Sequence, residues 1–155
     1  MYAYILAVHS LMRWLVLAGV LLALYRAYKG WLSKAPYTAF DNRLRHYSAT
    51  AAHIQLVLGL WLYVISPVTT YFLHHFNEAV HDRELRFFGM EHITMMLLAI
   101  IVITITSILS KRRQNDTAKF KTWALGYTLA LLIIISSVPW PFSPVVSRPW
   151  IRFWF

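Results

Sequence analysis

The sequence has no cysteine, little charge and few acidic side chains. Of its 155 residues, 59% are hydrophobic and only 14% are charged, whereas a soluble domain carries about 25% charged residues. The absence of cysteine excludes disulfides, thiolate metal sites, iron–sulfur clusters and covalent attachment of haem through a CxxCH motif. Redox chemistry in this chain therefore needs a bound cofactor. The shortage of charge indicates that most of the chain contacts lipid.

Four apolar runs are long enough to cross a bilayer as helices. A hydrocarbon core about 30 Å thick needs about 20 helical residues, with a range of about 17–25. The runs cover residues 2–28, 44–65, 87–109 and 122–138. We therefore predict an all-α protein, a four-transmembrane-helix bundle with up-down topology. The membrane domain comprises residues 1–141, and residues 142–155 form an aromatic interfacial tail.

The tail is rich in proline and tryptophan. Pro144 and Pro149 interrupt helix formation, and tryptophans such as Trp150 and Trp154 are typical of the membrane–water interface. We expect the tail to anchor the chain at this interface. A docking surface for a partner subunit is the alternative.

Basic residues are concentrated in two of the three connections between the runs. These ten residues are Arg26, Lys29, Lys34, Arg43, Arg45, Lys111, Arg112, Arg113, Lys119 and Lys121. The positive-inside rule then places both termini on the outer (periplasmic) side of a bacterial inner (cytoplasmic) membrane. Because the cations flank the spans, we expect anionic lipid rather than nucleic acid to be their partner.

Few ionisable side chains fall within the spans, and each needs a reason because a charge at the centre of a membrane helix costs roughly 2.5–3.5 kcal/mol. They are His9, Arg13, His53, Glu91 and His92. At a rise of about 1.5 Å per residue, His9 and His92 both lie roughly 10–12 Å below the outer boundary, and His53 lies roughly 8 Å deeper. In an up-down bundle the first and third helices are diagonal, so His9 and His92 face each other across the centre. Bundles hold haem iron in this way.

Neighbouring residues fit a haem site at this level. Gly59 on the second run lies at the same depth and leaves room for a flat macrocycle. Arg13 follows His9 by one helical turn on the same face, and its charge needs an anion, either Glu91 or a haem propionate. An ion pair of Arg13 with Glu91 that serves only helix packing is the structural alternative.

Two methionines follow His92 by one turn. Met95 and Met96 can pack against the ring, and methionine is also an axial ligand of haem. Glu91 points about 100° away from His92, so the two cannot share one iron. A di-iron carboxylate site needs several inward carboxylates, which this bundle lacks.

Two alternatives to haem remain open on the sequence. The same ionisable groups could form the polar path of a transporter or proton-conducting protein, or the chain could be an accessory subunit of a larger membrane complex. A minor alternative is a zinc or copper site built from His74, His75 and His81. The sequence contains no paired carboxylates spaced for acid–base chemistry, no serine with a base at helical spacing and no phosphate loop, so an independent enzyme is not predicted.

Four strings in the sequence resemble those of short four-span bacterial membrane proteins labelled cytochrome b. They are HSLMRW, HIQLVLGLWLYVISP, RFFGMEHITMMLLAIIVITI and SSVPWP, and residues 142–155 go beyond the pattern. The resemblance implies non-covalent haem b and electron transfer, with His9, His53 and His92 as the histidines of the family. We therefore expect His9 and His92 to bind the haem iron, with His53 as the alternative ligand and with Arg13, Gly59, Glu91 and Met95 around the cofactor. A quinone is a second candidate cofactor, and a redox protein, a larger complex or a second copy of the chain are candidate partners.

Overall fold

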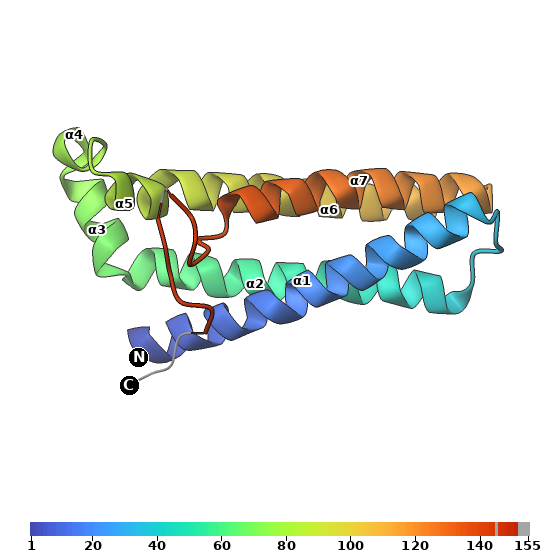
Figure 1. Cartoon of the computed structure of the whole chain (residues 1–155), viewed down its shortest axis with the longest axis horizontal. Helices are drawn as coiled ribbons and strands as arrows, with labels where there is room; N and C mark the ends of the chain where they lie inside the picture. The colour runs from blue at the N-terminus through green and yellow to red at the C-terminus, as the bar shows by residue number, and fades with distance from the viewer. Residues whose placement is uncertain (145, 152–155) are drawn as a thin grey trace.

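The computed structural model describes residues 1–144 and 146–151, and in this part of the chain every regular element is a helix (Figure 1). The elements are α1 (Tyr2–Leu32), α2 (Ala39–Ile65), α3 (Pro67–His74), α4 (Phe76–Ala79), α5 (Arg83–Arg86), a π-helix (Phe87–Glu91), α6 (His92–Arg112) and α7 (Asp116–Ser137). Four stretches are long and apolar enough to span a membrane: Tyr2–Leu32, Ala39–Ile65, Arg83–Arg112 and Asp116–Ser137. The prediction of an all-α bundle with four candidate membrane-spanning helices is confirmed.

Large apolar side chains cover the outside of the bundle. Leu15, Val57, Ile101 and Leu132 are each more than half exposed in the isolated chain. A lipid bilayer is the environment in which such a surface is stable. The chain is therefore a multi-pass membrane protein that contacts lipid along its helices.

The helices α1 and α6 lie diagonally opposite each other. Helix α1 packs against α2 and α7, and α6 packs against the same two helices. Glycines let neighbouring helices approach each other closely. A side chain at Gly126 of α7 would overlap Thr106 of α6, and one at Gly30 of α1 would reach within 2.5 Å of the Phe120 ring of α7. The diagonal placement means that side chains of α1 and α6 can meet only through the centre of the bundle.

Helix α2 begins before its apolar run, at a polar end that is capped. Thr38 accepts a hydrogen bond from the Asp41 main-chain nitrogen, and the Asp41 carboxylate accepts from the Thr38 nitrogen in return, which forms a capping box at the start of α2. Asp41 is fully buried and also pairs with Arg26 of α1 at 2.5 Å. This network joins the ends of α1 and α2.

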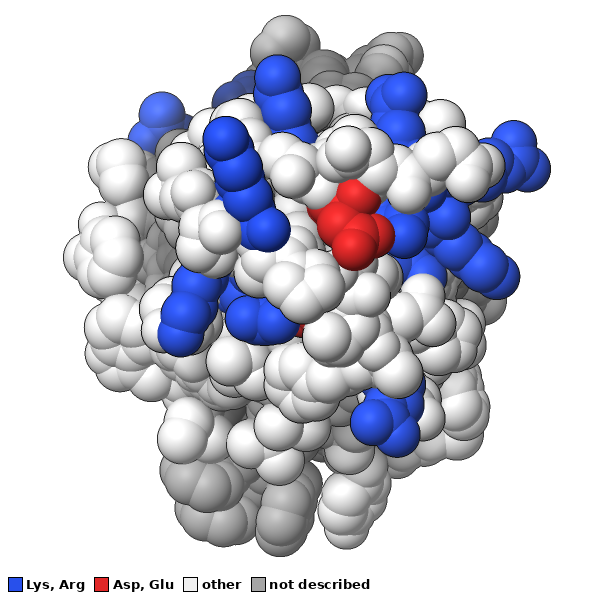
Figure 2. Space-filling model, turned by 90° about the vertical axis from the view of Figure 1, so that its right-hand side faces the viewer, with Lys and Arg blue, Asp and Glu red and all other residues white. Residues whose placement is uncertain are grey.

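The end of the bundle with the turn from α1 to α2 and the turn from α6 to α7 is strongly basic. Figure 2 shows this end, where lysine and arginine side chains surround a small acidic patch. Arg45 was predicted to belong to this group but is buried. Its guanidinium donates to the Ser107 main-chain oxygen at 2.8 Å, to the Ser107 hydroxyl and to Asn42 Oδ1. It is therefore a contact between α2 and α6 and not a surface charge.

At the opposite end, α7 stops short and an irregular segment continues in its place (Figure 1). We call the described residues 139–144 and 146–151 the strap. Its contacts with the bundle include hydrogen bonds from Arg13 Nη2 and Trp14 Nε1 to the Trp150 oxygen at 2.8 and 3.0 Å, and one from Arg83 to the Pro144 oxygen at 2.9 Å. The described part of the predicted interfacial tail thus packs back onto the bundle, while residues 152–155 lie outside the described residues.

Candidate functional site

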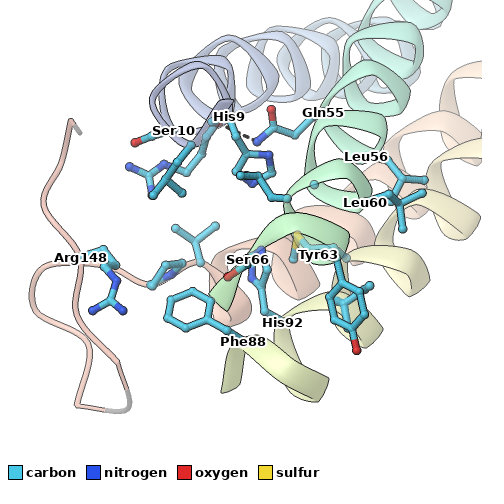
Figure 3. A pocket seen from close by; sticks show the side chains of 18 of the residues that line it. His9, Ser10, Gln55, Leu56, Leu60, Tyr63, Ser66, Phe88, His92 and Arg148 are labelled. Atoms are coloured by element: carbon cyan, nitrogen blue, oxygen red, sulfur yellow. Dashed lines mark hydrogen bonds between the residues drawn. The ribbon is translucent and has the colours of Figure 1, made fainter. Parts of the chain in front are cut away.

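A mostly apolar cavity of about 200 Å³ lies between the helices at the end where α7 gives way to the strap. Side chains of α1, α2, α6 and α7 line it, together with the π-helix and the strap. Four of the predicted site residues are among them: His9, Arg13, Gly59 and His92. Figure 3 shows His9 from α1 and His92 from α6 pointing into the space between the helices.

The imidazole of His92 is fixed by a hydrogen bond to α7. Its Nδ1 atom lies 2.8 Å from the main-chain oxygen of Ser137. A carbonyl oxygen can only accept, so Nδ1 carries the proton and Nε2 keeps the lone pair. A bond of this kind sets the tautomer of a metal-binding histidine and makes its free nitrogen a stronger ligand.

Two prolines explain why the Ser137 oxygen is available. The residue before a proline avoids the helical conformation, and Val138, before Pro139, has φ −80° and ψ 132° and ends the helix. Within a helix the Ser137 oxygen would accept from the nitrogen of residue 141, but Pro141 has no N–H. The sequence motif that terminates α7 therefore leaves an acceptor beside His92.

A π-helical turn immediately precedes His92. Its residue Gly89 is held on both sides: the Tyr63 hydroxyl donates to the Gly89 oxygen at 2.8 Å, and the Phe72 ring occupies the place that a side chain at position 89 would take. A π-turn adds one residue to a helical turn and so rotates the side chains of the next turn about the helix axis, and such turns are frequent at functional sites. This turn sets the direction from which His92 enters the cavity.

His9 enters the cavity from the diagonally opposite helix with an unpaired nitrogen. Its Nδ1 atom is buried and has no hydrogen-bond partner among the described residues. A Cβ atom at Gly59 would lie 3.2 Å from Cε1 of His9, so glycine at this position gives the imidazole its space. Gln55 donates to the His9 main-chain oxygen at 3.0 Å, and its own Oε1 is buried without a partner. Unpaired buried polar atoms in a cavity are typical of a site that binds a ligand or water.

Two arginines line the side of the cavity that the strap closes. Arg13 Nε is buried and unpaired, and Arg13 has no ion-pair partner among the described residues. Arg148, on the strap, lies with Cζ 4.9 Å from the centre of the Phe88 ring and pairs with Glu84. No Asp or Glu of the described residues lines the cavity. Its charged side chains are therefore the two arginines, and imidazole, amide and hydroxyl groups complete its polar lining.

Three predicted site residues do not line the cavity. Glu91 pairs with Arg86 at 2.7 Å and not with Arg13. Met95 does not line the cavity, whereas its neighbour Met96 does. His53 is exposed on the outside of the bundle, where Nδ1 is 2.7 Å from the Ala49 oxygen and Nε2 is 2.9 Å from Thr104 Oγ1. Their role in binding a cofactor therefore stays a prediction, because none of these three side chains lines the cavity.

The outer histidines do not assemble into a metal site. No group of three His, Cys, Asp or Glu side chains in the described part of the chain is placed to hold a metal ion. His74 Nδ1 instead lies 2.8 Å from the Thr70 oxygen of its own helix, and the His75 ring stacks on Tyr71 with ring centres 4.3 Å apart. The minor alternative of a zinc or copper site at His74, His75 and His81 therefore has no geometric support among the described residues.

Sequence reasoning missed several polar side chains of the cavity, among them Gln55 and Arg148. Gln55 is polar but not ionisable, and it lies within an apolar run. Arg148 belongs to a segment that was predicted to lie at the membrane interface, and only the return of the strap brings it to the cavity. The signal for Gln55 was a polar amide in a membrane span, whereas a single sequence carries no signal for the position of Arg148.

The lining can hold a flat, mostly apolar molecule. Two imidazoles on diagonal helices suit a metal that takes nitrogen ligands, and two guanidinium groups suit acidic substituents. Comparisons with protein-family models, with curated proteins and with solved structures find no match for the chain. The geometry of this cavity is therefore the basis on which a function is assigned.

Proposed function

We propose that this protein is a membrane b-type cytochrome that binds haem b non-covalently through His9 and His92 and transfers electrons. The observation that carries the proposal is the hydrogen bond from His92 Nδ1 to the Ser137 oxygen. This bond leaves Nε2 of His92 as the ligand atom, and His9 lines the same cavity from the diagonal helix. Haem supplies a one-electron couple when bound, because its iron alternates between the ferrous and ferric states.

The remaining lining supports a macrocycle in this position. Gly59 on α2 lacks the side chain that would meet His9, so the His9 imidazole can lie close to α2 within the cavity. Leu56 and Leu60 on the same helix are apolar and line the cavity as well. The chain would hold the ring between two imidazoles, exclude water from its apolar edge and leave the arginines for its acidic edge.

The placement of the other ionisable groups favours haem over a polar transport path. Such a path needs His53 and Glu91 to connect with the cavity, but both lie away from its lining. The role of an accessory subunit in a larger complex is compatible with the haem proposal, since a cytochrome can serve as the redox subunit of such a complex.

We further propose that the basic end of the bundle faces the cytoplasm of a bacterium. The excess of lysine and arginine at this end follows the positive-inside rule. The cavity then lies in the outer half of the inner membrane, where a quinone in the bilayer or a redox protein on the outer side could exchange electrons with the haem.

A visible absorption spectrum tests the haem proposal. Protein purified in detergent from cells with an adequate haem supply should give the reduced-minus-oxidised difference spectrum of a low-spin, bis-histidine haem. The variants His9→Ala and His92→Ala should lose this spectrum. His53→Ala is the matched control and should keep it, because His53 lies outside the cavity. A colourless wild-type protein would overturn the proposal, and loss of haem in His53→Ala alone would overturn the assignment of the ligands.

A further inference from the structure

The cavity has a different chemical character on each of its sides. The imidazoles come from α1 and α6, and α2 contributes Gly59 and leucines. Both arginines lie on the side that the strap closes: Arg148 belongs to the strap, which follows the end of α7 at Ser137, and Arg13 of α1 donates to the Trp150 oxygen of the strap. A ring held between α1 and α6 would therefore have one edge against an apolar helix and the opposite edge against cations.

Arg13 is a cation within a membrane span that lacks an anionic partner among the described residues. Its Nη2 binds the neutral Trp150 oxygen, and its Nε is buried and unpaired. Glu91, the acidic side chain that the sequence suggests as a partner of Arg13, forms its ion pair with Arg86 instead. A charged side chain in a span normally pairs with an opposite charge, so the surroundings of Arg13 call for an anionic ligand.

Arg148 can bind a second acceptor while it keeps its present one. Its partner Glu84 is half exposed, and an ion pair of this kind contributes little because water screens it. The guanidinium group offers five N–H donors in a planar fork, and it lies above Phe88, which also lines the cavity. The strap holds it there through the two bonds to the Trp150 oxygen on one side and the Arg83 bond on the other.

We infer that Arg13 and Arg148 form a carboxylate-binding pair on the strap side of the cavity, and that the two propionates of the haem are its ligands. The inference rests on the proposed haem function and extends it to the orientation of the cofactor. The propionate edge would then face the strap, and the opposite edge would face the leucines of α2. The strap is then a wall of the binding site, because it carries one of the two cations.

Haem and its dimethyl ester, in which both propionates are uncharged, separate this inference from haem binding as such. The purified apoprotein in detergent is titrated with each compound, and binding is followed by the shift of the haem absorption band. A charge-assisted contact with each propionate should make the free acid bind the wild type roughly tenfold or more tighter than the ester. Arg13→Gln and Arg148→Gln should each lose most of that ratio, with little change in ester binding.

Arg83→Gln is the matched control. Arg83 also holds the strap but does not line the cavity, so this variant should keep the wild-type ratio. If Arg148→Gln disturbs folding of the apoprotein, the rate of haem transfer from the purified holoprotein to excess apomyoglobin gives a second measurement, and it should rise roughly tenfold for the free acid only.

Each outcome has a separate meaning. Equal binding of acid and ester by the wild type overturns the carboxylate pair and leaves the haem function standing. A wild-type ratio that Arg148→Gln keeps overturns the role of the strap. Failure of the wild type to bind either compound overturns the proposed function itself.

Discussion

The Nδ1 atom of His92 and the main-chain oxygen of Ser137 are 2.8 Å apart and join α6 to α7 inside the bundle. The sequence does not reveal this pairing, because the acceptor is a backbone atom. This bond depends on two prolines. Pro139 ends the helix after Ser137, and Pro141 lacks the N–H that would otherwise donate to the Ser137 oxygen. A helix end thus fixes the orientation of an imidazole in the cavity, which the proposed haem ligation requires.

Continuing α7 past Ser137 should raise the reduction potential of the bound haem. In the double variant Pro139→Ala/Pro141→Ala the helix can extend, and the new N–H at position 141 competes for the Ser137 oxygen. His92 then becomes a weaker donor and stabilises the ferric state less. A potentiometric titration should show an increase of roughly tens of millivolts, where about 59 mV corresponds to a tenfold change for one electron.

Single substitutions control for other effects of the prolines. Pro139→Ala supplies no N–H at position 141, and Pro141→Ala leaves Pro139 to hold Val138 in its extended conformation, so each should shift the potential less than the double variant. Pro144→Ala changes the strap away from His92 and should leave the potential as in the wild type. An unchanged potential in a folded double variant would contradict the role of this hydrogen bond.

Side chains at position 59 should displace haem in proportion to their size. A Cβ atom there lies 3.2 Å from Cε1 of His9, which is tighter than ordinary contact, so Gly59→Ala requires His9 to move by a few tenths of an ångström and should reduce haem content in part. Gly59→Leu takes the space of the His9 imidazole and should abolish binding. The measurement is the ratio of haem to purified protein.

Gly19 provides the matched control on the neighbouring helix. A Cβ atom there would lie 3.9 Å from Cβ of Ser48, an ordinary contact, and Gly19 does not line the cavity. Gly19→Ala should therefore keep the full haem content. A haem content equal to that of the wild type in Gly59→Leu would show that the cofactor lies elsewhere.

The arrangement of the spans could be predicted because it depends on long apolar runs. Their number, and the diagonal relation of the first and third runs, follow from hydrophobicity and short connections. The same regularity allowed depths to be counted along straight helices, which grouped His9 with His92 and separated His53 from them. In the structure His9 and His92 line the cavity, whereas His53, which was also predicted as a cofactor-binding residue, does not.

The details that depend on irregular backbone could not be predicted. The π-turn before His92 and the return of the strap to α1 arise from contacts between segments far apart in the chain, such as Tyr63 with Gly89 and Arg13 with Trp150. Arg45 shows the same limit for charge, because its burial depends on a main-chain oxygen of α6. Counting charges between apolar runs cannot distinguish it from its exposed neighbours.

Removing the carboxylate of Asp41 should destabilise the basic end of the bundle. Asp41 is fully buried and binds Arg26, the Thr38 nitrogen and the Thr38 hydroxyl. Breaking a buried ion pair from one side costs about 3–5 kcal/mol, and Arg26 is about a quarter exposed, so Asp41→Ala should lower the free energy of unfolding by roughly 3 kcal/mol. Thermal unfolding in detergent should show a lower midpoint.

Asp116→Ala is the control for this change. Asp116 starts α7 and pairs with Lys119, but its side chain is 41% exposed, and exposed pairs contribute about 0–1 kcal/mol. Its midpoint should fall much less than that of Asp41→Ala. Equal effects of the two substitutions would mean that the buried network does not hold α1 and α2 together.

The absence of cysteine makes the orientation of the chain directly measurable, because a single introduced thiol has no native competitor. Asn77 in α4 and Gln114 in the turn before α7 are both exposed and lie at opposite ends of the bundle. If the basic end faces the cytoplasm, a membrane-impermeant maleimide should label Asn77→Cys at the inner membrane of cells whose outer membrane has been opened. Gln114→Cys should react only after the inner membrane is also permeabilised. The reverse pattern would place the cavity in the cytoplasmic half of the bilayer and would move the proposed electron exchange to that side.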